Sequence, residues 1–336
     1  MKDDSINRFV LKTLTATIPV LAIVVLYVIL DPFGVVRRQE PCPAFKSAIP
    51  FNKGYISTCA YIDGRERYKY DSFIFGSSRT INFRADNWAK HIGKNASIFH
   101  FDASNETPEG ILLKMQFIQS KGDTIRNALI EIPPIFFNDR SEYLSYRTPW
   151  QLDGLVSAPA FHYYYLKRFT DWSMFKSIIK YKITGAMPPI EIADKVRFLT
   201  TLIDGYDEKT NETYFNSRDS LYALHPEYGL SPKYDITKFH FTDKRATAYH
   251  LLILKQINAI LQKDRTNFKI ILGPMPDYTV LNSNDTDSIK SIFGAKNVYD
   301  LSKYRKAYSS GMTFYDNTHF TPSLAKEMLD TVYYCK

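Results

Sequence analysis

The chain has 336 residues, of which 45% are hydrophobic and 23% are charged, as in an ordinary folded protein of one large domain or two small ones. Its formal charge of +8 is spread along the sequence without a block of like charge. Nucleic-acid-binding proteins usually carry a clustered basic patch, which this sequence lacks. The diffuse charge favours a solvated basic surface, or attraction to anionic lipid or polysaccharide. No cysteine pair or cysteine–histidine cluster has the spacing of a zinc site, so the sequence predicts no metal and no cofactor.

The first long apolar stretch predicts a membrane anchor. Residues 13–30 carry no charge and contain one helix breaker, Pro19. With residues 9–11 added, the stretch reaches the roughly 20 residues that cross a bilayer. A buried core helix and a cleaved signal peptide are the alternatives. A cleavage site expects small residues after the apolar core, whereas Asp31-Pro32-Phe33-Gly34 follows here.

The orientation of the anchor is predicted from the lengths on either side of it. Basic residues lie both before and after the apolar segment, so the positive-inside signal is weak. A short tail and a large body favour residues 1–12 as a cytoplasmic tail, 13–30 as a transmembrane helix and the body on the periplasmic side of the membrane.

Residues 31–69 are expected to form an irregular connector, because prolines recur in their first half. Cys42 and Cys59 lie in this segment, close to each other in sequence. In an oxidising compartment they could pair and close a short loop. Two unpaired thiols are the equally supported alternative.

The remainder, residues 70–336, reads as an α/β domain. Short apolar segments predict strands at 72–75, 96–101, 127–132, 268–273 and 298–301. Helical patterns are expected around 81–92, from Thr107 onward, at 243–262 and from 321 to 333. Strands that alternate with helices through short turns argue for a parallel sheet with right-handed crossovers.

Residues 139–240 interrupt this alternation. They are rich in tyrosine, phenylalanine and tryptophan, in a chain whose aromatic content reaches 15%. We expect a mainly helical and irregular insertion here. It would form a cap, a docking surface or a plain structural subdomain.

The predicted strand at 72–75 ends in Gly76-Ser77-Ser78, which allows a sharp turn into a helix. A hydroxyl there lies at the carboxyl edge of the sheet, where open α/β sheets bind their ligands. Backbone N–H groups of the turn point into the same space and suit an anion or an oxyanion. Arg79 follows, and it is expected either to bind an anionic group of a substrate or to form a surface ion pair.

A serine hydroxyl becomes nucleophilic only beside a base, and the base needs a third group to orient it. Asp316 and His319 stand three residues apart, just before the last predicted helix. A turn of this size can direct both side chains at one point, and the closing helix would bring His319 to Ser78. The pattern alone is common, so a surface histidine is the alternative. Ser77 is the alternative nucleophile, with Ser78 then acting as a helix cap.

Residues 75–79 and 315–320 resemble the first and last blocks of the SGNH (GDSL-type) hydrolase superfamily. The similarity is to its membrane-anchored extracytoplasmic branch, which includes DltD-like and polysaccharide O-acetyltransferase-like proteins. The resemblance implies a flavodoxin-like three-layer αβα fold. It makes Ser78 the nucleophile, His319 the base and Asp316 its orienting group.

Residues 101–109 are similar to the second block of this superfamily, with Asn105 in place of the usual glycine. The oxyanion hole would then combine Ser78 and Asn105. The third block, Gly-x-Asn-Asp, is not cleanly present, since Asn138-Asp139 follows the third strand later than expected.

Together these features predict a membrane-anchored serine O-acyltransferase or esterase that acts on acyl esters of a cell-envelope polysaccharide or related polymer. The resemblance implies an integral-membrane O-acyltransferase of the MBOAT type as partner and a cell-envelope glycan as substrate. Transfer and hydrolysis both stay open. The alternative is a non-catalytic scaffold of the SGNH fold, which would dock such an acyltransferase or bind glycan through the aromatic insertion.

Overall fold

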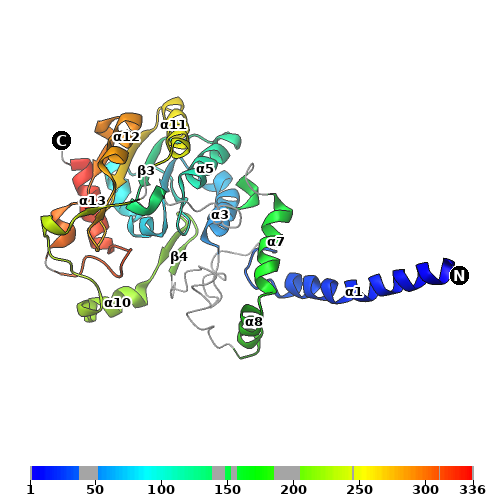
Figure 1. The fold of residues 1–336 in the computed structure, drawn as a ribbon. Coiled ribbons are helices and arrows are strands. Elements are labelled where there is room, and N and C mark those ends of the chain that lie inside the picture. Colours follow the sequence, from blue (N-terminus) through cyan, green and yellow to red (C-terminus); the bar gives the residue numbers. More distant parts are fainter. Residues whose placement is uncertain are drawn as a thin grey trace.

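The structure is a computed structural model and describes residues 2–37, 52–137, 148–152, 157–184, 205–243, 246–309 and 311–334. It is a mixed α/β fold on a central parallel sheet, with one long N-terminal helix outside the body (Figure 1). The strands are β1 (Ser72–Phe75), β2 (Ile98–His100), β3 (Asn127–Glu131), β7 (Asn267–Leu272) and β9 (Val298–Asp300). Their order is β2-β1-β3-β7-β9, and all neighbours pair in parallel. The five predicted strands are thus confirmed, with small shifts at their ends.

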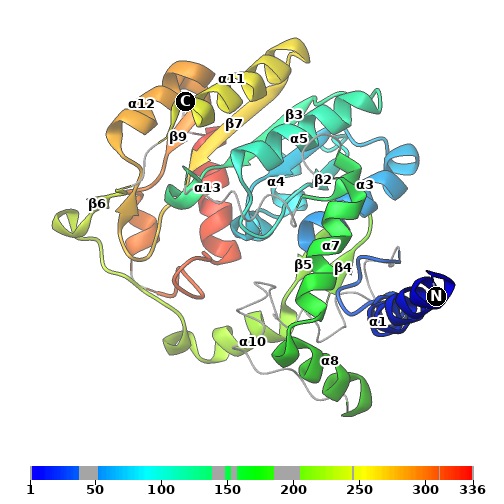
Figure 2. The same ribbon diagram turned by 45° about the vertical axis from the view of Figure 1, so that its right-hand side comes forward.

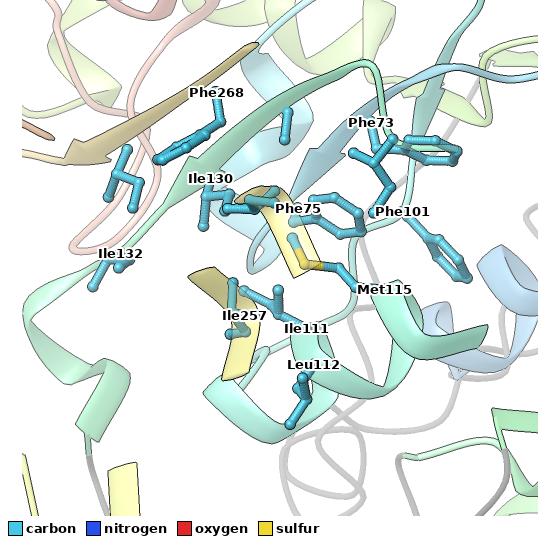
Figure 3. Packing of buried hydrophobic residues seen from close by; sticks show 14 of the residues in the cluster. Phe73, Phe75, Phe101, Ile111, Leu112, Met115, Ile130, Ile132, Ile257 and Phe268 are labelled. Atoms are coloured by element: carbon cyan, nitrogen blue, oxygen red, sulfur yellow. The ribbon is translucent and has the colours of Figure 1, made fainter. Parts of the chain in front are cut away.

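Helices cover both faces of the sheet, because successive side chains of a strand point to opposite faces. Phe73 and Phe75 face one layer, and Ile74 faces the other. The first layer is built from α3 (Lys53–Tyr68), α5 (Pro108–Ser120), α11 (Ala248–Lys263) and α12 (Ser283–Phe293). The second contains α4 (Ala85–Ile92) and α13 (Pro322–Tyr334). Figure 2 shows α11 and α5 lying along the sheet, and Figure 3 shows their apolar side chains meeting those of the strands.

Helix α3 lies where the sequence predicted an irregular connector. Its mixed polar and aromatic sequence has no clear apolar periodicity, so the pattern gave no sign of a helix. Burial of Tyr61 stabilises it in place: this side chain is fully buried, and its ring lies 5.2 Å from that of Phe101 and 5.7 Å from that of Phe99. Cys59 is buried in the same helix, whereas Cys42 lies outside the described residues. The disulfide between them stays a prediction.

The described part of the insertion is largely helical, as expected. Its helices are α7 (Ala158–Phe169), α8 (Trp172–Thr184) and α10 (Asn216–Leu224). A hairpin of β4 (Gly205–Asp207) and β5 (Glu212–Tyr214) reaches the edge of the main sheet, where His100 N–H donates to Thr210 O at 2.8 Å. Two further short strands, β6 (His240–Phe241) and β8 (Thr279–Val280), pair with each other.

The N-terminal helix α1 (Lys2–Leu30) projects away from the body (Figure 1). Its segment Arg8–Leu30 is long and apolar enough to cross a membrane. Only 6% of the apolar window is buried against the rest of the protein. Most of the helix therefore lies outside the core, which argues against the buried-helix alternative.

The aromatic core on the α3 side should dominate stability. Phe73→Ala removes a fully buried ring and leaves a cavity, so we expect a loss of about 3–5 kcal/mol in the free energy of unfolding. Urea denaturation of the detergent-solubilised chain measures the free energy of unfolding of the wild type and of the variant. The control Leu252→Ala lies on the exposed side of α11 and should change stability little. Equal losses in both variants would contradict this assignment of the core.

Candidate active site

The serine turn directly follows β1 and begins at Gly76. Its φ of 149° lies in the region that favours glycine, and a Cβ there would come within 2.6 Å of the Thr80 side chain. A 3-10 helix, Ser78–Asn82, comes next, and α4 begins only at Ala85. The turn therefore leads into a tighter helix than the sequence suggested. It places the Ser78 side chain at the carboxyl edge of the sheet.

The two distant motifs meet at this edge. The Ser78 Oγ lies 2.8 Å from the His319 Nε2. The His319 Nδ1 lies 2.9 Å from one carboxylate oxygen of Asp316 and 3.0 Å from the other. Ser78 is 8% exposed, and the His319 side chain is 19% exposed, so the pair can be reached from solvent. This chain of contacts is the arrangement that activates a serine hydroxyl.

The carboxylate of Asp316 is organised by its own turn. It accepts hydrogen bonds from the backbone N–H groups of Thr318 at 2.7 Å and His319 at 2.8 Å. Tyr315 N–H closes the turn by donating to His319 O at 2.8 Å. Burial by itself would raise the pKa of Asp316, but the hydrogen bonds from the ring and backbone of His319 outweigh it and lower the pKa to about 2. Asp316 is therefore ionised at neutral pH.

The structure also separates the two serines. The Ser77 Oγ accepts from the Arg79 N–H at 3.4 Å and caps the 3-10 helix, while its carbonyl accepts from Thr80. Ser78, the neighbour, faces the imidazole instead. Ser77 thus occupies the capping position that the sequence assigned to Ser78 in the alternative reading.

Arg79 is completely buried, so the expected surface ion pair is wrong. Its Nε donates to the Glu131 Oε1 at 2.8 Å, and its guanidinium also donates to the carbonyls of Pro274, at 2.7 Å, and Thr318. The same group stacks 5.0 Å above the centre of the Phe320 ring. One side chain thereby joins the serine turn, the end of β3, the loop after β7 and the histidine turn.

The backbone on both sides of His319 is held by the serine segment. Arg79 binds the carbonyl of Thr318, and the side-chain amide of Asn82 donates to the carbonyl of Phe320. The Phe320 ring packs 5.3 Å from that of Phe83. His319 is therefore fixed against the same short helix that carries Ser78.

Sequence reasoning missed Glu131, which ends β3 and is fully buried. Burial raises its pKa, while the Arg79 guanidinium opposes the shift. Its second carboxylate oxygen has no hydrogen-bond partner among the described residues. The sequence signal that could have identified Glu131 is a charged residue at the end of an apolar strand. A charged side chain is buried there only when it has a partner of opposite charge.

The loop after β2 carries Asn105 and lies beside the serine turn, since Ala103 N–H donates to Gly76 O at 3.2 Å. Asn105 adopts a φ of 50°, a conformation open to glycine and asparagine. Buried lysines hold both ends of the loop. Lys53 lies 3.6 Å from the Asp102 carboxylate, and Lys114 pairs with Glu106. Asn138 and Asp139, the candidates for the third block, lie outside the described residues.

Helix α10 of the insertion packs against the histidine turn, which the sequence did not indicate. Tyr315 Oη donates to the Asp219 carboxylate at 2.6 Å, and the Arg218 guanidinium lies 3.9 Å from the centre of the Tyr315 ring. The insertion therefore packs against the turn that carries Asp316 and His319.

No family model matches the chain, and no curated protein matches it in sequence. The chemistry of the site follows from its own contacts. A hydroxyl, an imidazole and a carboxylate stand in series at the rim of the sheet. Within the described ranges, no group of three or more histidine, cysteine or acidic side chains is arranged to hold a metal ion.

The depressed pKa of Asp316 predicts a pH-dependent contribution to stability. Because the folded pKa of about 2 lies below the ordinary value of 3.8, this contribution is present above pH 3.8 and is lost as the pH falls towards 2. The difference in stability between the wild type and Asp316→Asn should therefore shrink between pH 5 and pH 3. Half-exposure of the side chain keeps the effect modest. Thermal unfolding across this range measures it, with Asp287→Asn on α12 as control. A difference that stays constant with pH would contradict the assignment.

The buried ion pair predicts a second, larger effect. Arg79→Met leaves the Glu131 carboxylate buried without its partner, and we expect a loss of about 3–5 kcal/mol in unfolding free energy. The double variant Arg79→Met/Glu131→Met should be more stable than the single one, because the uncompensated charge is gone. Lys326→Met breaks an exposed pair with Asp330 and serves as control, with little change expected. A double variant that is less stable than Arg79→Met would refute this reading.

Proposed function

We propose that this protein is a membrane-anchored serine acyltransferase or esterase. The observation that carries the proposal is the 2.8 Å contact between Ser78 Oγ and His319 Nε2, with Asp316 on the other nitrogen of the same ring. A histidine placed in this way is both aligned to take the hydroxyl proton and held in the required tautomer. Acyl transfer is the reaction class that such a series serves.

In the proposed reaction, Ser78 Oγ attacks an acyl carbonyl carbon while its proton passes to His319 Nε2. The ionised Asp316 stabilises the resulting imidazolium. His319 then protonates the departing alcohol oxygen, and the acyl group stays on Ser78 as an ester. A second hydroxyl, of an acceptor polymer or of water, gives its proton to His319 and attacks the ester carbonyl carbon. His319 returns that proton to Ser78 Oγ as the bond between Oγ and the acyl group breaks.

The oxyanion of each tetrahedral intermediate needs hydrogen-bond donors that are already in place. The backbone N–H of Ser78 lies at the start of the 3-10 helix, where it has no acceptor within that helix. Asn105, on the adjoining loop, is the proposed second donor. Its left-handed backbone supports this role, because an asparagine can take the position at which the SGNH superfamily carries glycine.

The strand order also supports membership of the SGNH superfamily. Counted along the chain within the main sheet, the order β2-β1-β3-β7-β9 is 2-1-3-4-5, the order of flavodoxin-like folds. Ligands of such sheets bind beyond the carboxyl ends of the strands, where Ser78 lies.

Anchoring through α1 is the second part of the proposal. Three threonine hydroxyls in its apolar stretch donate to carbonyls of the preceding turn, so they present no unsatisfied donor to lipid. Arg8 and Lys12 near its N-terminal end can reach the headgroups. We place the body on the periplasmic side, beside an MBOAT-type acyltransferase, with a cell-envelope polysaccharide as acceptor.

Substitution of the triad tests this function. Ser78→Ala and His319→Ala should each lower hydrolysis of an activated ester such as p-nitrophenyl acetate by about 10⁴-fold or more, with an unchanged unfolding transition. Ser77→Ala is the matched control and should retain activity, because Ser77 only caps the helix.

Labelling with a fluorophosphonate probe provides a second readout. The wild type and Ser77→Ala should be labelled, and Ser78→Ala should not. An unlabelled wild type would favour the scaffold alternative, in which the fold docks a membrane acyltransferase without chemistry of its own.

A further inference from the structure

We propose that α7 and α8 form a lipid-docking surface that rests on anionic headgroups of the membrane that α1 crosses. The proposal rests on the anchoring part of the proposed function and does not depend on the triad. It assigns a role to α7 and α8, whereas α10 is the helix of the aromatic insertion that packs on the histidine turn.

The C-terminal end of α1 packs against the insertion. The ring of Tyr27 lies 5.8 Å from that of Phe169, and the ring of Phe33 lies 5.2 Å from that of Tyr165. Tyr27, Phe33 and Val35 are almost fully buried in one apolar cluster with residues of α3, α7 and α8. The chain after the helix is fixed as well, since the Asp31 carboxylate accepts three backbone N–H groups of residues 35–37. The direction of α1 is therefore set by its packing on the body.

Helices α7 and α8 lie crosswise to α1, on the face of the body from which α1 projects. Figure 1 shows α1 leaving beside the lower end of α7, with α8 next to it. In Figure 2 α1 is strongly foreshortened, and α7 lies beside it. A membrane crossed by α1 would accordingly lie along α7 and α8.

The length of α1 sets the depth of this surface. The 23 residues of Arg8–Leu30 extend over about 35 Å, whereas the hydrocarbon core is about 30 Å thick. Tyr27, in the last turn, thus lies near the edge of the hydrocarbon. The side chains that pack on Tyr27 then lie in the headgroup layer beyond that edge.

A row of aromatic rings extends from Tyr27 to the surface of α8. The Phe169 ring lies 5.4 Å from that of Phe175, which stacks 6.1 Å from the ring of Trp172. Trp172 is 68% exposed, and Ile183, at the other end of α8, is 78% exposed. Tryptophan at the level of the headgroups is typical of proteins at the membrane interface, since its ring is apolar and its N–H is polar.

The exposed charges of the same helices are mostly basic. Among the side chains that the structure describes here, the exposed basic ones are Lys167, Arg168, Lys176 and Lys180, and an exposed acidic one, Asp171, lies between the two helices. The Lys176 Nζ lies 5.4 Å from the centre of the Trp172 ring, so a cation and an apolar ring lie next to each other on the surface of α8. Basic residues interleaved with exposed aromatics complement anionic lipid, whose attraction acts within a short distance of the surface.

Fluorescence of the full-length chain in vesicles tests the docking. The chain is reconstituted into phosphatidylcholine vesicles with one quarter phosphatidylglycerol, with and without lipid brominated near the headgroup end of the acyl chains. We expect quenching of tryptophan emission in the wild type and loss of most of it in Trp172→Phe. Trp88 is fully buried and supplies the unquenched background, and Trp150, which is 40% exposed, is replaced by phenylalanine in every chain that is compared.

A charge variant identifies lipid as the occupant. Lys176→Glu/Lys180→Glu should lose the quenching, whereas Lys255→Glu/Lys263→Glu, on the exposed side of α11, should keep it. The difference between these variants should vanish in vesicles without phosphatidylglycerol.

Carbonate extraction separates the possible failures. A chain that carbonate releases from the vesicles would overturn the anchor and the docking together, and would leave the esterase assay of the triad untouched. A retained chain with unquenched Trp172 would overturn the docking alone, and would leave these helices to a protein partner. Equal quenching in both charge variants would overturn the role of anionic lipid.

Discussion

The site depends on the burial of one arginine side chain. Arg79 follows the serine of the site, and its guanidinium binds the carbonyl of Thr318, which precedes the histidine. Its other contacts reach the ends of β3 and the loop after β7. Ser78 and His319 come from opposite ends of the domain, so their separation depends on this bridge. A buried guanidinium suits the task, because its five donors have a fixed geometry and its charge is permanent.

The same bridge imposes an electrostatic cost. A charge removed from water needs a close partner, and Glu131 provides one at 2.8 Å. One oxygen of that carboxylate has no hydrogen-bond partner among the described residues, and burial raises the pKa of Glu131. An apolar core of equal volume would be at least as stable, by the general behaviour of buried ion pairs. The pair is therefore better explained by what it fixes, namely the position of the histidine turn, than by the stability it adds.

The sequence predicted what depends on local pattern. Apolar runs located the strands, and the order of two short motifs brought Ser78 and His319 to one edge. Two features escaped it because they depend on distant contacts. Helix α3 has no amphipathic period and is held by the packing of Tyr61. Arg79 looks like any arginine of a basic chain, and only the fold shows that Glu131 lies opposite it.

The insertion between β3 and β7 contacts both the N-terminal helix α1 and the candidate site. Its first helices, α7 and α8, pack against the C-terminal end of α1. Its later helix, α10, packs on Tyr315 beside the turn that carries Asp316 and His319. Neither contact belongs to the main sheet, whose strands pair among themselves. What the sheet alone cannot determine is how the site is oriented towards the anchor. Under the proposed function, that orientation would determine which acyl donors and acceptors the protein can reach, because a membrane confines the anchor to one plane. We therefore interpret the insertion as the element that adapts a general α/β fold to work at a membrane surface.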